Sequence, residues 1–301
     1  GTHCAGIIAS RKADPDDKAP LGVASMANTK IMPIKVLTKD GAGGFQAIEK
    51  GVRWAMHNGA KVLSMSLGAG LEFEDVKASE LRNKVFEEAI EQGVIIVVAA
   101  GNENCPLGGK CSNSSGLFSK KFNEYTVLPC AYDQTICVGA SNADETLAEY
   151  SNHWSQKASD AYRTQADINA PGTAIYSTWP ISIIPEGTKI ISGTSMATPF
   201  VAGVAALIKT VVPNMTQSQM LEILQKSQAF PEALKEKSNT GRLDLHRALL
   251  FTAKNYLDMT VEGDIEQLPP PKEVAPPETE DSGGGSGAVE AVSSLWGAVC
   301  Q

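Results

Sequence analysis

The chain has 301 residues, 43% of them apolar, which is enough for one large domain with a buried core. Its net charge is −8, but residues 261–301 carry eight acidic residues and one lysine, so residues 1–260 are left with a charge of −1. Without a surplus of basic residues, nucleic acid is not an expected partner. The longest apolar run, residues 94–100, is too short to span a membrane, so we expect no membrane span.

Apolar segments alternate with amphipathic ones along the first 260 residues. The run VIIVVAA at 94–100 is continuous and rich in β-branched residues, which is typical of a strand covered on both faces. In chain order, we predict a strand at 31–37, a helix at 45–58, a strand at 61–67, a helix at 74–92, strands at 94–100, 135–141 and 174–178, and helices at 196–211, 217–226 and 243–256. This alternation indicates an α/β fold with a mostly parallel sheet between layers of helices.

The composition changes near residue 261. The stretch LPPPKEVAPPETEDSGGGSG is rich in Pro, Glu, Ser and Gly and cannot bury a core, so we predict a disordered linker. The closing AVEAVSSLWGAVCQ is apolar again, and it either docks on the domain or begins a further element. We therefore divide the chain into a domain at 1–260 and an acidic tail at 261–301.

Six cysteines are present, and none has zinc-ligand or CxxC spacing. Two pairs, Cys105/Cys111 and Cys130/Cys137, are close enough in sequence to form disulfides within loops if the compartment is oxidising. Reduced, packed thiols explain these positions equally well, because spacing alone does not settle connectivity.

The stretch SGTSMATPFVAGVAALI at 192–208 places Ser195 where an extended segment becomes a helix rich in Ala and Gly. The free backbone N–H groups of a helix start favour an anion, which suits a nucleophile, although a serine that merely caps the helix is the alternative. In AAGNENC at 99–105, Asn102 follows the C-terminal end of a predicted buried strand, where parallel α/β folds build their sites. Its amide could donate a hydrogen bond to an oxyanion, although asparagine after glycine is also an ordinary turn residue.

Four segments together resemble the subtilisin-like serine proteases (subtilases). SGTSMATPFVAGVAALI, VVAAGNEN, VLSMSLGAG and GTHCAGIIAS match four blocks of that family in the right order, across residues 1 to about 250. GTSMATP is highly specific, and together with GTHCAG it leans toward the proteinase-K-like members. The resemblance implies a three-layer sandwich with its first strand or strands missing. Ala197 stands where the α/β-hydrolase elbow requires glycine, which disfavours an esterase or lipase.

The resemblance also implies roles for individual residues. Ser195 would be the nucleophile, and Asn102 would donate to the oxyanion together with the Ser195 N–H. Substrate binding is implied for Gly41, Gly43, Phe45, Ser66, Leu67, Gly68, Ala99, Ala100 and Gly101. Residues 41–43 and 66–68 would pair as strands with the substrate, and the small uncharged linings predict tolerance of apolar side chains. The insert at 105–129 departs from the family pattern, so the resemblance does not identify the residues that form the floor of the pocket.

The general base is not identified among these residues. The family's histidine block reads His-Gly-Thr-His, with the first histidine catalytic, and this chain opens at Gly-Thr-His. His3 therefore corresponds to the second, structural histidine, and the resemblance places the catalytic histidine immediately before Gly1 and the aspartate farther upstream. We expect His57, His153 and His246 to be structural as well, and the isolated chain to fold poorly and to hydrolyse almost nothing.

The sequence thus predicts most of the catalytic domain of a serine endopeptidase that acts on polypeptides. A chain that truly begins at Gly1 would instead be an inactive pseudoprotease or a peptide-binding module. A propeptide or a protein inhibitor is an expected partner, and the expected location is secreted or in a secretory or vacuolar lumen. We expect no organic cofactor. Asp14, Asp16 and Asp17 suit a structural Ca²⁺, although their spacing follows no EF-hand pattern and we favour a solvated acidic loop.

Overall fold

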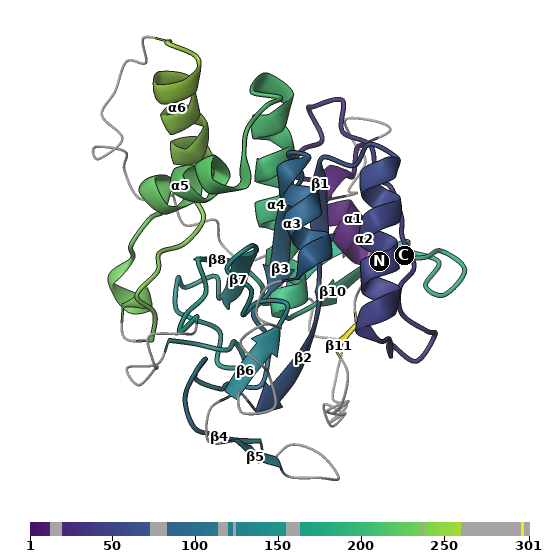
Figure 1. Ribbon diagram of the computed structural model, residues 1–301, viewed down its shortest axis with the longest axis vertical. Helices are drawn as coiled ribbons and strands as arrows, with labels where there is room; N and C mark the ends of the chain where they lie inside the picture. Colours follow the sequence, from purple (N-terminus) through teal and green to yellow (C-terminus); the bar gives the residue numbers. More distant parts are fainter. Residues whose placement is uncertain are drawn as a thin grey trace.

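The computed structural model describes residues 1–12, 20–72, 83–113, 120–122, 125–154, 163–235, 237–259 and 296–297. Its centre is a four-stranded parallel sheet in the order β1-β3-β7-β8 (Figure 1). These strands are β1 (Val62–Met65), β3 (Ile95–Ala99), β7 (Ile136–Ser141) and β8 (Ile168–Pro171). β3 and β7 are buried along their whole length, as expected for inner strands of a sheet that is covered on both faces.

Helices cover both faces of this sheet, so the expected three-layer sandwich is confirmed (Figure 1). Successive side chains of β3 point to opposite faces. Ile96 and Val98 pack in the core beneath α2 and α3, whereas Ile95 and Val97 pack beneath α4 and α5. The helices are α1 (Thr2–Ala9), α2 (Phe45–His57), α3 (Lys84–Glu91), α4 (Thr194–Val211), α5 (Gln217–Ser227) and α6 (Leu245–Tyr256), with a short 3₁₀ turn at Glu232–Leu234.

Smaller antiparallel sheets flank the central one. They consist of β2 (Leu67–Glu72) between β6 (Tyr125–Leu128) and β11 (Trp296–Gly297), the hairpin of β9 (Ile175–Thr178) with β10 (Thr188–Ile191), and β4 (Cys111–Asn113) with β5 (Lys120–Phe122). The hairpin leads directly into α4, and therefore into Ser195.

The strand predicted at 31–37 does not form. This segment makes no ladder hydrogen bonds within the described part of the chain. A groove of about 720 Å³ lies between it and β1, with Ile31 and Ile34 lining one side and Val62 and Met65 the other. β1 is consequently an edge strand, and the apolar segment that would extend the sheet has no strand to pair with.

Two other sequence-based boundaries are wrong, and one correctly predicted strand lies outside the central sheet. The strand predicted at 61–67 ends at Met65, because the Ser66 hydroxyl bonds to the Ser195 carbonyl and the chain then turns into β2. The helix predicted at 74–92 begins at Lys84, since Asn83 is extended and its side chain caps the helix by accepting from the Val85 N–H at 2.9 Å; residues 74–82 lie outside the described residues. The strand predicted at 174–178 belongs to the β9–β10 hairpin and not to the central sheet.

The bounds of the remaining predicted helices and strands agree with those in the structure to within about two residues. α5 has the predicted capping box between Thr216 and Gln219. Both proposed cysteine pairs are bonded, so the disulfide alternative is the one that the structure supports. By length and composition alone α4 could cross a membrane, but 72% of that apolar window is buried inside the protein, where α4 serves as the core helix.

Candidate active site

Ser195 is the second residue of α4, at the N-terminal end of this core helix. The chain reaches it through β10 and then Gly193, whose φ of 152° lies in the region that favours glycine and turns the strand into the helix. The Ser195 residue is 8% exposed. Its Oγ donates to the Ser66 carbonyl at 3.5 Å, and this is the single hydrogen bond of that hydroxyl within the described residues.

Asn102 lies beside this helix start, as the sequence predicted. Its Oδ1 accepts hydrogen bonds from the Thr194 N–H at 2.7 Å and from the Thr194 hydroxyl at 2.8 Å. Because a backbone N–H can only donate, the oxygen of the amide must face Thr194, and Nδ2 is left for another acceptor. A Cβ built on Gly193 would lie 3.3 Å from that Nδ2, which places the free donor next to the residue that precedes Thr194 and Ser195.

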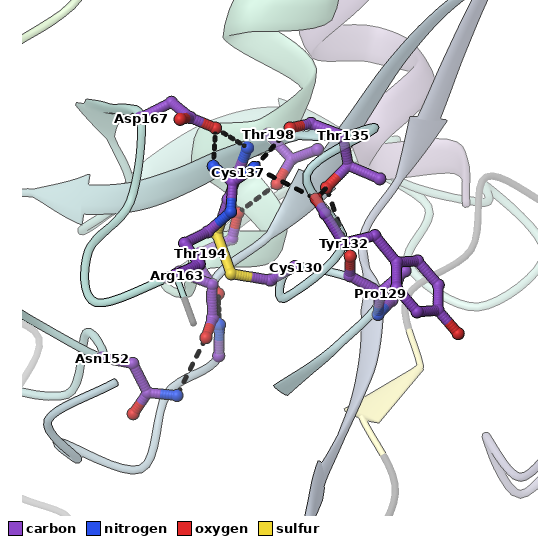
Figure 2. Close-up of a disulfide and its surroundings, with 12 residues drawn as sticks. Pro129, Cys130, Tyr132, Thr135, Cys137, Asn152, Arg163, Asp167, Thr194 and Thr198 are labelled. Carbon is purple, nitrogen blue, oxygen red and sulfur yellow. Dashed lines mark hydrogen bonds and ion pairs between the residues drawn. A yellow bond between two sulfur atoms is a disulfide. The ribbon is translucent and has the colours of Figure 1, made fainter. Parts of the chain in front are cut away.

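The loop that carries Asn102 is held by a buried asparagine farther along the chain. Asn152 is 1% exposed, and its Nδ2 donates to the Ala100 carbonyl at 2.9 Å (Figure 2). Its Oδ1 accepts from the Cys105 N–H at 2.9 Å and from the Glu103 N–H at 3.2 Å. One side chain therefore fixes both ends of the turn from Ala100 to Cys105.

A carboxylate and a neutral phenol lie next to this clamp. The Asn152 Nδ2 also donates to the Glu103 carboxylate at 2.7 Å. Burial, and after it the Glu103 charge, raises the pKa of Tyr125 well above its ordinary value of 10.0. Tyr125 therefore stays neutral, and it can offer a phenolic hydrogen to its surroundings at any ordinary pH.

A disulfide fixes the strand next to β3. Cys130, just after β6, is bonded to Cys137 in β7, as Figure 2 shows. The Asp167 carboxylate accepts from the Cys137 N–H at 2.7 Å and forms an ion pair with Arg163. Arg163 also donates to the carbonyls of Tyr132 and Thr135, at 3.1 and 2.9 Å. This network ties the end of β6 to the sheet that carries the Asn102 loop.

The predicted substrate-binding residues fall into two groups. Contacts join the first group to Ser195: the Ser66 hydroxyl donates to the Ser195 carbonyl at 2.7 Å, Leu67 and Gly68 follow at the start of β2, and the Gly101 N–H donates to the Thr194 hydroxyl at 3.2 Å. Ala99 ends β3 and Ala100 follows it. The second group is Gly41, Gly43 and Phe45, which lead into α2. In this second group, Phe45 makes an edge-on ring contact with Tyr132, with ring centroids 6.5 Å apart.

All four histidines lie in the described part of the chain, and none is hydrogen-bonded to the Ser195 hydroxyl. His3 is 2% exposed, and its Nε2 lies 3.0 Å from the carbonyls of Ile175 and Lys189 in the β9–β10 hairpin. Burial lowers the pKa of His3 below its ordinary value of 6.5. His57 ends α2 and bonds to the Arg53 carbonyl, as expected for a histidine near a helix C-terminus.

The described residues contain no group of three or more His, Cys, Asp or Glu side chains suited to a metal ion. The acidic loop with Asp14, Asp16 and Asp17 lies outside the described residues, so the calcium expectation stays a prediction.

The fold and the site define an α/β protein with a serine at the start of a core helix and an amide beside it. The family model described as "Subtilase family" matches residues 1–252, so the chain belongs to the subtilase family. The chain is 34% identical to subtilisin DY of Bacillus licheniformis over 221 residues, which are 73% of this chain and 66% of that protein. It is 35% identical to subtilisin E of Bacillus subtilis over 232 residues, which are 76% of this chain and 50% of that protein.

Solved structures agree with this assignment. A cold-adapted subtilisin-like serine proteinase superposes with a TM-score of 0.58 at 28% identity, covering 80% of this chain and 72% of its own. The prenylagaramide maturation protease PagA shares the fold, with a TM-score of 0.61 at 24% identity over 83% of this chain and 81% of its own. The chain spans about half to two thirds of the length of the subtilisins it matches.

Sequence reasoning missed Thr194 and Asn152, the two residues that position Asn102. Thr194 stands inside the quoted GTSMATP motif, so its place beside the nucleophile was a usable signal. Asn152 gave no such signal, because its partners lie about 50 positions earlier in the chain.

Proposed function

We propose that this chain forms most of the catalytic domain of a serine endopeptidase. The observation that carries the proposal is the contact between Asn102 and Thr194, which brings an amide donor to the start of the helix that bears Ser195. Family membership and the names of the related subtilisins support the same reaction.

In this proposal Ser195 Oγ attacks the carbonyl carbon of the scissile peptide bond, and its proton passes to a general base. The carbonyl oxygen becomes an oxyanion, to which Asn102 Nδ2 and the Ser195 N–H donate. The base then protonates the leaving amine, and water hydrolyses the acyl-enzyme on Ser195. Thr194 saturates the Asn102 oxygen, so the amide pays no reorganisation cost when the negative charge develops.

We propose that the base and its aspartate belong to residues that precede Gly1. Two features support this. No imidazole is hydrogen-bonded to Ser195 within the described residues, and a groove of about 720 Å³ lies beside the edge strand β1, where a further strand would fit the sheet. Its walls are mainly apolar side chains from α2, from α4 and from residues 31–36, with a few polar residues such as Ser64 and Lys209. A strand placed there would pair with the free edge of β1 and remove an unprotected sheet edge.

The proposed substrate is an extended polypeptide with apolar side chains. Leu67 and Gly68 lie at the start of β2, one residue beyond the Ser66 carbonyl that meets Ser195 Oγ, so a peptide added to that edge would pass the nucleophile. A propeptide or a protein inhibitor would use the same edge. The two disulfides support a secreted or luminal location, because such bonds persist in oxidising compartments.

Reaction with a fluorophosphonate probe tests this proposal. The full 301-residue chain and a form extended with its native upstream coding sequence are compared, with Ser195→Ala as the control. In subtilisin, a member of this family, loss of the histidine alone costs about 10⁶ in turnover. We therefore expect strong labelling of Ser195 in the extended form and almost none in the chain alone. Stoichiometric labelling of the chain alone would disprove the placement of the base, and an unreactive extended form would disprove the endopeptidase.

A peptide-binding module without hydrolysis is the second candidate, favoured by the lack of a base beside Ser195 among the described residues. It predicts that the 301-residue chain by itself binds an apolar peptide and leaves it intact.

A further inference from the structure

The edge of β2 that leads to Ser195 already has an occupant from this chain. β11 pairs antiparallel with β2, with Trp296 opposite Gly68 and Gly297 opposite Leu67. In the sheet order β11-β2-β6, the tail strand lies on the edge of β2 away from β6 (Figure 1). Two residues from the last six of the chain thus meet the two residues that follow Ser66.

This edge is close to the nucleophile. Ser66 immediately precedes β2 and is joined to Ser195 by two hydrogen bonds, one from each hydroxyl to the carbonyl of the other residue. A strand that pairs with Leu67 and Gly68 therefore lies where a substrate backbone would have to lie in order to reach Ser195.

The tail is suited to this position by its composition and its length. Residues 291–299 read AVSSLWGAV, which contains no charged side chain, although residues 261–290 are strongly acidic. Strand addition draws its affinity from main-chain hydrogen bonds and its selectivity from pockets, so an apolar, uncharged segment fits the small uncharged linings of this site. The 36 residues between Met259 and Trp296 are enough to permit the approach, since even the root-mean-square span of a random chain of 36 residues is roughly 30–35 Å.

We propose that the C-terminal segment around Trp296 and Gly297 is an intramolecular occupant of the peptide-binding edge of β2 and competes there with peptides from solution. This inference rests on the proposed function, in which that edge binds substrate. A tether of this length holds its end at an effective concentration on the order of 1 mM, so even a weak contact is populated. If the tail occupies the edge about nine tenths of the time, it weakens the binding of a free peptide about tenfold.

The first experiment measures the pairing of β11 with β2 and does not depend on catalysis. Hydrogen exchange followed by mass spectrometry is measured on the extended form with the parent tail, on Gly297→Pro, and on the matched control Gly287→Pro, each of them with the native upstream sequence. Proline at 297 removes a backbone donor inside the paired strand, whereas position 287 lies ten residues earlier in the tail. We expect slowed exchange at 296–297 and 67–68 in the parent chain and in Gly287→Pro, and fast exchange in Gly297→Pro.

Two outcomes of this experiment overturn the inference. One is exchange at 296–297 as fast as in an unstructured peptide in the parent chain. The other is protection that grows with protein concentration, because the occupant would then be the tail of a second copy.

The second experiment measures the competition between the tail and a free peptide for the edge of β2. A fluorescein-labelled peptide with the sequence of residues 291–299 is titrated with each protein and followed by fluorescence anisotropy. We expect a Kd about tenfold lower for Gly297→Pro than for the parent chain, with Gly287→Pro equal to the parent. Equal Kd values for all three, together with a protected tail, would refute the competition. Neither result depends on Ser195 reactivity, so failure of this inference is distinguishable from failure of the proposed protease.

Discussion

Replacing Asn152 by alanine tests whether this side chain holds the Asn102 loop. The change removes the donor to the Ala100 carbonyl and the acceptor for the Cys105 N–H, both fully or nearly buried. Each buried group left without a partner costs about 1–3 kcal/mol, so we expect the free energy of unfolding to fall by about 2–4 kcal/mol. The contacts with Glu103 add little, because water can replace them at that partly exposed residue.

Urea unfolding of the form extended with its native upstream sequence, followed by circular dichroism, measures this loss. An m-value of about 2–3 kcal/mol/M converts it to a midpoint lower by about 1 M. Asn255→Ala is the matched control, since Asn255 is exposed on α6 and bonds within its own helix, and it is expected to change stability by less than about 0.5 kcal/mol.

An Asn152→Asp variant sharpens the argument. It keeps an acceptor for the Cys105 N–H but turns a second oxygen toward the Ala100 carbonyl and the Glu103 carboxylate. We therefore expect it to be at least as unstable as Asn152→Ala. If Asn152→Ala unfolds at the same urea concentration as the parent chain, or if Asn152→Asp is as stable as the parent, Asn152 is not the clamp described above.

Three further predictions follow from buried contacts. Because burial lowers the pKa of His3, the unfolded chain binds a proton near pH 6.5 that the folded protein does not. The free energy of unfolding should therefore decline as the pH falls below about 6.5, and thermal melts at several pH values should show that His3→Gln lacks part of this decline. Replacing Cys130 and Cys137 by alanine opens a short loop and should cost about 2 kcal/mol in urea unfolding, and an unchanged midpoint would contradict the bond. Gly193→Ala combines a φ of 152° with a Cβ 3.3 Å from Asn102 Nδ2, so probe labelling of Ser195 in the extended form should fall at least tenfold, and labelling at the parent rate would show that Asn102 does not act there.

Local patterns in the sequence were sufficient for the elements whose physical cause is local. β3 followed from a continuous run of β-branched residues, and α5 from its capping box, because burial on both faces and helix capping leave their mark on neighbouring residues. The motifs likewise identified Ser195 and Asn102 as the chemistry-bearing residues and placed the chain in its family.

Tertiary structure decided the rest, because the forces involved join residues that are far apart in sequence. β8 contains Asn169 and Pro171 and does not read as a buried strand, yet Asn169 is satisfied by Ser238 at 3.0 Å and by the Thr240 carbonyl at 3.0 Å. Residues 31–37 do read as a strand, but a strand forms only where a neighbour offers its backbone, and the β1 edge faces a groove instead. Cysteine spacing left two alternatives open until the fold brought the Cα atoms within 5.3 and 5.0 Å.

The arrangement of the active site is also a tertiary property. The amide of Asn102 is oriented by Thr194, 92 positions later, and its loop by Asn152, about 50 positions later. Composition showed that the last residues of the chain were apolar, but not where they would bind. The pairing of Trp296 with Gly68 depends on the edge of β2 that lies away from β6, since a backbone donor or acceptor is free to pair only where the folded sheet leaves it so.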